Sequence, residues 1–160
     1  NGYKALTFHG VGMDYPIYED MKKFVIDPGK ASQGGPHVGS VLYSRGMYAA
    51  VVIAEAIKKA QELSGTSAIT AAQLRDGFEA LDITPERLAE LGLPDFGPEI
   101  KMTCDNHGGS GMSRVQQWDA GAGKWNLITG FTEPDQEILT PLLLEDSEAY
   151  AKEAGITPRC

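Results

Sequence analysis

Positive charge and long apolar runs are both scarce in this chain of 160 residues. Its 14 lysines and arginines are outnumbered by 22 aspartates and glutamates, so the formal net charge at pH 7 is −8. An acidic surface repels phosphate backbones and is not attracted to anionic membranes, which disfavours nucleic acid and membrane surfaces as partners. The longest apolar run, residues 48–54, is far shorter than the roughly 20 residues that span a bilayer.

The start of the chain has neither an initiator methionine nor the charged-then-apolar pattern of a secretory signal. We therefore expect a processed or trimmed chain, or a fragment of a longer protein. The composition is that of a globular domain, with 42% hydrophobic and 22% charged residues. A chain of this length is long enough to build one compact core.

Cysteine is limited to Cys104 and Cys160, and Cys160 is the last residue. A free thiol at a flexible terminus is prone to oxidation outside the cytoplasm. An even number of cysteines in an exported protein favours one disulfide, which would tie the tail to the body of the domain. The alternative is two unpaired thiols in a cytosolic protein.

His107 lies three residues after Cys104 and raises two further possibilities. A structural zinc site needs four ligands, and the chain has only two cysteines. A Cys/His enzyme needs a thiolate, a base and an orienting group, but this Gly-rich stretch has no strand-turn-helix elbow. The disulfide explains both cysteines more simply, so we expect no metal, no cofactor and no catalytic residue, with a Cys/His enzyme kept as an alternative.

Apolar periodicity predicts a largely buried strand over residues 3–8 and a long helix over residues 48–63. Between them we expect a short helix and an exposed loop over residues 30–39, and after them two helices that begin at Thr70 and Thr84. A hairpin over residues 112–130 precedes a helical tail, residues 134–155, that is interrupted at Pro141. Trp118 and Trp125 flank the turn of the hairpin, where they would form either a sugar-binding platform or a cross-strand packing pair. A single leading strand cannot supply the neighbours that a parallel sheet needs, so we expect the missing strands upstream of Asn1.

Several stretches together resemble one protein family. They are residues 38–60 (VGSVLYSRGMYAAVVIAEAIKKA), the helix with Leu74 and Phe78, the segment with His107, the motif Val115-Gln-Gln-Trp118 with Trp125, and the ending YAKEAGITPRC. This pattern resembles the C-terminal part of leucine/isoleucine/valine-type periplasmic solute-binding proteins of ABC transporters, which have the type I periplasmic-binding fold.

The resemblance implies an α/β fold with two lobes, in which helices pack on a mainly parallel sheet and a β-hairpin and helical tail follow. Residues 1–105 would form part of the first lobe. Residues 106–160 would form a crossover, a hairpin in or beside the second lobe, and the tail, and the N-terminal half would be absent. A ligand would lie between the lobes, which close by a hinge motion.

The function that the resemblance implies is solute capture for an ABC importer in the periplasm, without catalysis. The solute would be small and polar, such as an amino acid, an amide or a small organic acid, and the partner would be the transporter's membrane permease. The alternatives are a ligand-binding sensor domain of the same fold and the Cys/His enzyme.

Four residues are the candidates for ligand binding. Tyr43 lies in the connection before the long helix, where the resembled family places a group that faces the cleft, and Ser44 and Arg45 follow it. An arginine can bind a carboxylate with two hydrogen bonds. His9 follows the first predicted strand, and strand ends point into the crevice of open α/β sheets. The alternatives are a tyrosine packed under a loop, a solvated histidine, and an arginine paired with one of the chain's own carboxylates.

Overall fold

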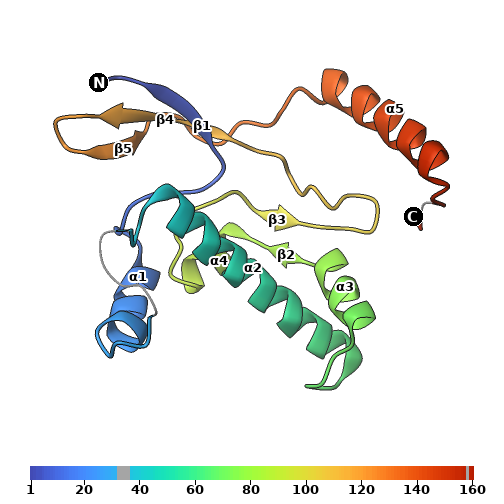
Figure 1. Cartoon of the computed structure of the whole chain (residues 1–160), viewed down its shortest axis with the longest axis horizontal. Coiled ribbons are helices and arrows are strands. Elements are labelled where there is room, and N and C mark those ends of the chain that lie inside the picture. Colours follow the sequence, from blue (N-terminus) through green and yellow to red (C-terminus); the bar gives the residue numbers. More distant parts are fainter. Residues whose placement is uncertain (32–36, 158) are drawn as a thin grey trace.

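The computed structural model describes residues 1–31, 37–157 and 159–160, so part of the loop expected over residues 30–39 lies outside the described residues. In these ranges the chain has an α+β fold with five α-helices and two small antiparallel sheets (Figure 1). The elements in chain order are β1 (Lys4–Thr7), α1 (Pro16–Met21), the π-helical η1 (Lys22–Ile26), α2 (Val41–Ser64), α3 (Ala71–Glu79), β2 (Asp82–Ile83), α4 (Pro85–Glu90), β3 (Ile100–Lys101), β4 (Arg114–Asp119), β5 (Lys124–Leu127) and α5 (Gln136–Ala154).

Antiparallel pairing replaces the mainly parallel sheet that the sequence led us to expect. The larger sheet has the order β1-β4-β5, and Leu6 lies opposite Val115 in its first pair. The smaller sheet joins β2 to β3. All the strand pairs among the described residues are antiparallel. The prediction of a two-lobed fold with helices packed on a mainly parallel sheet is therefore wrong. β1 finds its neighbour in a strand more than 100 residues later, which no local pattern could have revealed.

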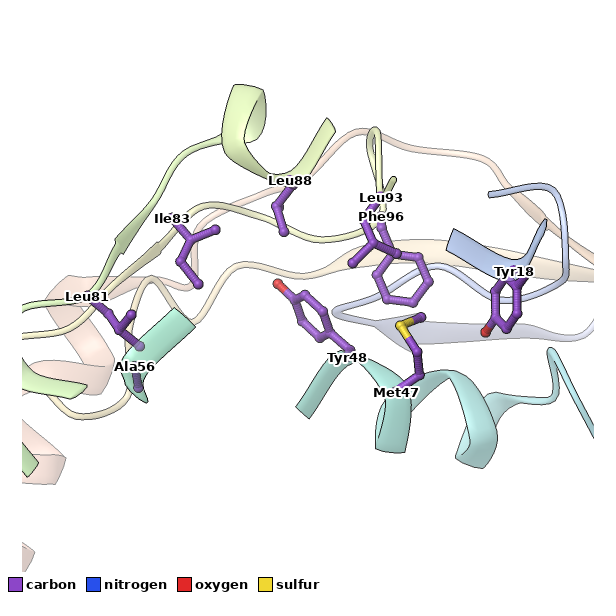
Figure 2. Close-up of a cluster of buried hydrophobic side chains, with 9 residues drawn as sticks. All are labelled: Tyr18, Met47, Tyr48, Ala56, Leu81, Ile83, Leu88, Leu93 and Phe96. Atoms are coloured by element: carbon purple, nitrogen blue, oxygen red, sulfur yellow. The ribbon is translucent and has the colours of Figure 1, made fainter. Parts of the chain in front are cut away.

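The core lies between α2 and the segment from β2 to Phe96. Figure 2 shows Tyr48 in the middle of the buried cluster, between Ile83 and Leu88 on one side and Phe96 on the other. The rings of Tyr48 and Phe96 are 5.2 Å apart between centroids. Burying each of these large side chains stabilises the fold by roughly 1.5–3 kcal/mol.

The long helix α2 begins at Val41, seven residues before the predicted start. Ser40 occupies the N-cap position in an extended conformation, which suits a serine at that place. Gly46 obscured this start in the sequence, since a glycine inside a helix costs roughly 1 kcal/mol. The burial of Ser44 and Met47 offsets that cost, and Tyr43 therefore lies in the first turn of α2 instead of a connection.

Two other predicted elements differ in detail. β1 is not largely buried, because Leu6 is 73% exposed while Thr7 is 6% exposed. The tail helix α5 continues through Pro141 instead of breaking there. Asp135 accepts hydrogen bonds from the amides of Glu137 and Ile138 and so stabilises the first turn just before the proline.

The tail stands apart from the rest of the fold. No residue of α5 is buried, and Figure 1 shows this helix to one side of the body. The predicted disulfide between Cys104 and Cys160 is present and fastens the end of the tail, with 5.8 Å between the two Cα atoms. None of the helices in the described ranges combines the length and the apolar character needed to cross a membrane.

Candidate functional site

His9 and Arg45, two of the four predicted ligand-binding residues, contact each other at the end of β1. The His9 ring is fully buried, and Arg45 Nε donates a hydrogen bond to its Nε2 over 3.3 Å. Since Nε2 accepts, the ring proton lies on Nδ1, which donates to the Gly10 carbonyl oxygen over 2.8 Å. Burial lowers the pKa of His9, and the Arg45 charge acts in the same direction. His9 is therefore a neutral imidazole with both nitrogens already bonded.

The other two predicted residues, Tyr43 and Ser44, gather around Tyr18 of α1. Ser44 is fully buried, and its hydroxyl lies 2.7 Å from the Tyr18 hydroxyl. The rings of Tyr18 and Tyr43 are 6.4 Å apart between centroids. Burial raises the pKa of Tyr18 above its usual value, so its hydroxyl stays protonated at neutral pH. This cluster joins α1 to the first turn of α2.

A cleft of about 590 Å³ lies beside these two clusters, and none of the four predicted residues lines it. Its walls come from the loop after β1, the start of α2 and the β4–β5 hairpin; we call it the hairpin cleft. The lining residues are Val11, Gly12, Asp14, Tyr15, Gly39, Ser40, Val41, Trp118, Gly123, Lys124, Trp125, Asn126 and Leu127.

Two tryptophans form the hairpin side of the cleft. Trp118 of β4 and Trp125 of β5 are direct cross-strand partners, with ring centroids 5.5 Å apart at an angle of 60°. The two rings thus pack on each other, as one of the two sequence interpretations expected, and they also present apolar area to the cleft. These are the only tryptophans in the sequence.

The opposite side of the cleft combines apolar residues, Val11 and Val41, with polar groups. Ser40 and Val41 bring the N-terminus of α2 to the cleft, and the Ser40 side chain caps none of the helix amides. The first amides of a helix have no partner within it and carry partial positive charge, so this end attracts anionic or hydrogen-bond-accepting groups. Asp14 adds a carboxylate nearby. The cleft therefore offers hydrogen-bonding groups at the loop and the start of α2, and two aromatic rings together with Lys124 and Asn126 on the hairpin.

A close backbone contact joins the loop after β1 to the residue before the N-cap of α2. The Gly12 amide donates to the Gly39 carbonyl oxygen over 2.9 Å. Gly39 has φ +78°, and a Cβ there would lie 2.6 Å from Met13 Cγ. Only glycine accepts this conformation without strain, so the loop after β1 and the start of α2 keep a fixed separation. The sequence did not reveal Asp14 and Ser40 as cleft residues, because the cleft forms only where the distant hairpin folds back beside them.

The Cys104 region is arranged as an anchor for the tail. Cys104 is bonded to Cys160, and the last residue of α3, Glu79, pairs with both Arg159 and His107. The hydrogen bond from Arg159 lowers the pKa of Glu79, which keeps this carboxylate charged. Among the described residues, no three His, Cys, Asp or Glu side chains are grouped so that they could hold a metal ion.

No protein-family model matches the sequence, and no curated protein matches it. A crystal structure of an ABC transporter permease from the Pseudomonas fluorescens group is similar over 99% of this chain, with a TM-score of 0.89 and 36% sequence identity. The match covers 38% of that chain, so the present chain spans well under half of its length.

This match contradicts the prediction that the chain belongs to the leucine/isoleucine/valine-type solute-binding proteins. The stretches behind that resemblance are largely helix-forming and packing residues, and most of residues 38–60 simply form α2. Such a pattern reports a buried helix and does not by itself identify a family. The chain is instead related in sequence and fold to part of an ABC transporter permease.

Proposed function

We propose that the chain is a periplasmic part of an ABC importer that binds a small polar solute in the hairpin cleft and passes it to the membrane-spanning part of the transporter. The observation that carries the proposal is the cleft itself, where two tryptophans face a helix N-terminus and a carboxylate. The similarity to a permease supports a role in transport. The disulfide supports an oxidising compartment.

The chemistry of the cleft fits an amino acid, an amide or a small organic acid. A carboxylate or carbonyl oxygen of the solute would accept hydrogen bonds from the first amides of α2 and from the Ser40 hydroxyl. An amino or amide N–H would donate to Asp14, and the remaining carbon chain would lie on Trp118 and Trp125. The net charge of −8 gives no support to a nucleic-acid partner.

The four residues predicted from the sequence have supporting roles in this proposal. Arg45 does not line the cleft; its guanidinium bonds to His9 and lies over the Phe8 ring, so it would hold the end of β1 against α2. His9, Tyr43 and Ser44 would position the first turn of α2. The proposal includes no chemical change of the solute, and the alternative of a Cys/His enzyme has no support, because the disulfide leaves Cys104 no thiolate to attack with.

Tryptophan fluorescence tests the proposal directly, because both tryptophans of the chain line the cleft. Titration with amino acids, amides and small organic acids is expected to give a saturable emission change for one of the three classes. Asp14→Asn is expected to weaken binding of an amine- or amide-bearing solute roughly 10-fold, since a charge-assisted hydrogen bond contributes about 1.5–3 kcal/mol. Asp27→Asn, an exposed carboxylate that does not line the cleft, is the matched control.

Two results would contradict the proposal. One is the absence of a saturable emission change with all three solute classes at millimolar concentration. The other is equal affinity in Asp14→Asn, Asp27→Asn and the unchanged chain for a solute that carries an amino or amide group, which would place the bound solute elsewhere.

A further inference from the structure

An uninterrupted apolar stripe runs along the outer side of α2. It consists of Leu42, Gly46, Ala49, Ala50, Ile53 and Ile57, which we call the α2 stripe. All six are exposed, and Leu42 is 76% and Ile53 46% exposed. Their spacing of three and four residues puts them on roughly 100° of the helix circumference. No charged residue lies within this sector.

Most of the buried residues of α2 lie on other sides of the helix. Ser44, Met47 and Tyr48 face the core, and Ala56 and Ala60 pack on α3. An ordinary surface helix has one apolar face toward the core and a polar face toward water. Besides its core-facing side and its polar residues, α2 has a second apolar face over residues 42–57, and the described part of the chain leaves this face exposed.

β1 independently shows apolar side chains that point to the solvent. Leu6 and Phe8 point to one side and are 73% and 44% exposed, whereas Thr7 points to the other side and is buried. A half-buried strand normally alternates with its apolar residues inward. The edge of β1 away from β4 also has no strand partner among the described residues. Strand and helix thus both carry apolar side chains that the described residues leave uncovered.

The related permease is longer than this chain, which leaves room for a further segment over these faces. The match takes in 38% of that chain, so more than half of it lies outside the match. In the centre of the α2 stripe, Gly46, Ala49 and Ala50 have at most one side-chain carbon each, whereas Leu42 and Ile53 are larger. Small residues at this place let a second helix approach to the usual 8–10 Å between axes.

We propose that the α2 stripe is an interface for an apolar helix supplied by a further segment of the same polypeptide, in the place of the permease residues outside the match. The proposal does not depend on the hairpin cleft or on any solute. A second copy of this chain on the stripe is the competing outcome of the test.

The test introduces a charge into the α2 stripe with Ala50→Glu. A matched control, Ala54→Glu, makes the same substitution at an exposed position of α2 outside the stripe. Both variants are made in the 160-residue chain and in the longer polypeptide that contains it. Thermal unfolding and light scattering on a sizing column then report stability and oligomeric state.

The expected result depends on the length of the protein. In the longer polypeptide, Ala50→Glu lowers the Tm by roughly 5 °C or more or prevents folding, because it buries an unpaired charge, while the control does not. In the 160-residue chain, the two variants have the same Tm. Ile53→Ala, which adds no charge, lowers the Tm of the longer polypeptide more than that of the 160-residue chain, and it still tests the interface if Ala50→Glu does not fold.

Three results would overturn the proposal. The first is a longer polypeptide that tolerates Ala50→Glu and Ile53→Ala as well as the control. The second is a 160-residue chain that forms a dimer which Ala50→Glu converts to a monomer, since that would assign the stripe to a second copy. The third is an intact mass showing that the natural protein contains no segment beyond these 160 residues.

Discussion

At the scale of single residues, the Glu55–Arg87 ion pair ties α4 to α2. Arg87 Nε and Nη2 each donate to a different oxygen of Glu55 over 2.8 Å, and the Glu55 side chain is only 15% exposed. A two-pronged pair of this kind is stronger than an ordinary surface salt bridge. The hydrogen bonds from Arg87 hold the pKa of Glu55 below its usual value, against the opposing effect of burial.

The pair should make stability depend on pH. A carboxyl whose pKa is lower in the folded state stabilises the fold above its unfolded pKa, and this contribution disappears as the pH falls through the folded pKa. Glu55→Gln should therefore lose about 1–2 kcal/mol at pH 7 and lose progressively less in acid. Urea unfolding at a series of pH values measures this. Glu62→Gln, a more exposed carboxylate of the same helix, is the control, and an equal loss at every pH would refute the assignment.

The sequence pointed to several candidate residues but could not predict which residues they contact. His9, Ser44 and Arg45 were singled out, but the partner of Ser44 is 26 residues away and that of His9 is 36 residues away. Such contacts depend on how the chain folds back, which local patterns do not encode. The cysteine pairing could be predicted because two cysteines allow only one intramolecular bond.

At the scale of elements, the packing of α3 on α2 depends on a single glycine. Gly77 is buried, and a Cβ added there would meet the Ala56 carbonyl oxygen and lie 2.8 Å from Ala60 Cβ. Both neighbours belong to α2, and the nearer one is a backbone atom that cannot rotate away. The absent side chain is what permits the close approach of the two helices.

Gly77→Ala should therefore separate the two helices, although alanine favours a helix over glycine. Overpacking costs typically 1–3 kcal/mol, which exceeds the gain in helix propensity of about 1 kcal/mol, so we expect a net loss of about 1–2 kcal/mol. Gly46→Ala in the 160-residue chain is the control, because no atom lies within 4 Å of its added Cβ, and it should be stabilising. Urea unfolding compares the two, and a stabilising Gly77→Ala would disprove the close contact.

The elements themselves were only partly predictable. Thr70 caps α3 in a capping box with Gln73, a local signal that the sequence displays fully. The start of α2 was missed because tertiary packing overrides the cost of Gly46. The parallel sheet was wrong because the apolar run at β1 specifies a strand but not the direction of its neighbour, which β4 supplies from the other end of the chain.

At the scale of the whole molecule, the tail and the body are joined mainly by a covalent bond. The Cys104–Cys160 disulfide closes a loop with a sequence separation of 56 residues. Inside that loop lies α5, which has no buried residue. Near the bond, the ion pair of Arg159 with Glu79 adds a second attachment at the surface.

Reduction of the disulfide should release the tail and leave the core folded. Loop-closure entropy alone would assign a bond across 56 residues about 4 kcal/mol. The bond also restrains a tail that packs poorly in the folded state, so we expect a loss of only about 1–2 kcal/mol. Urea unfolding with and without reductant measures the loss, and an intact-mass gain of two hydrogens verifies the reduction. Amide exchange should accelerate in α5 and stay slow in α2. Loss of cooperative unfolding on reduction would show instead that the core itself depends on the tail.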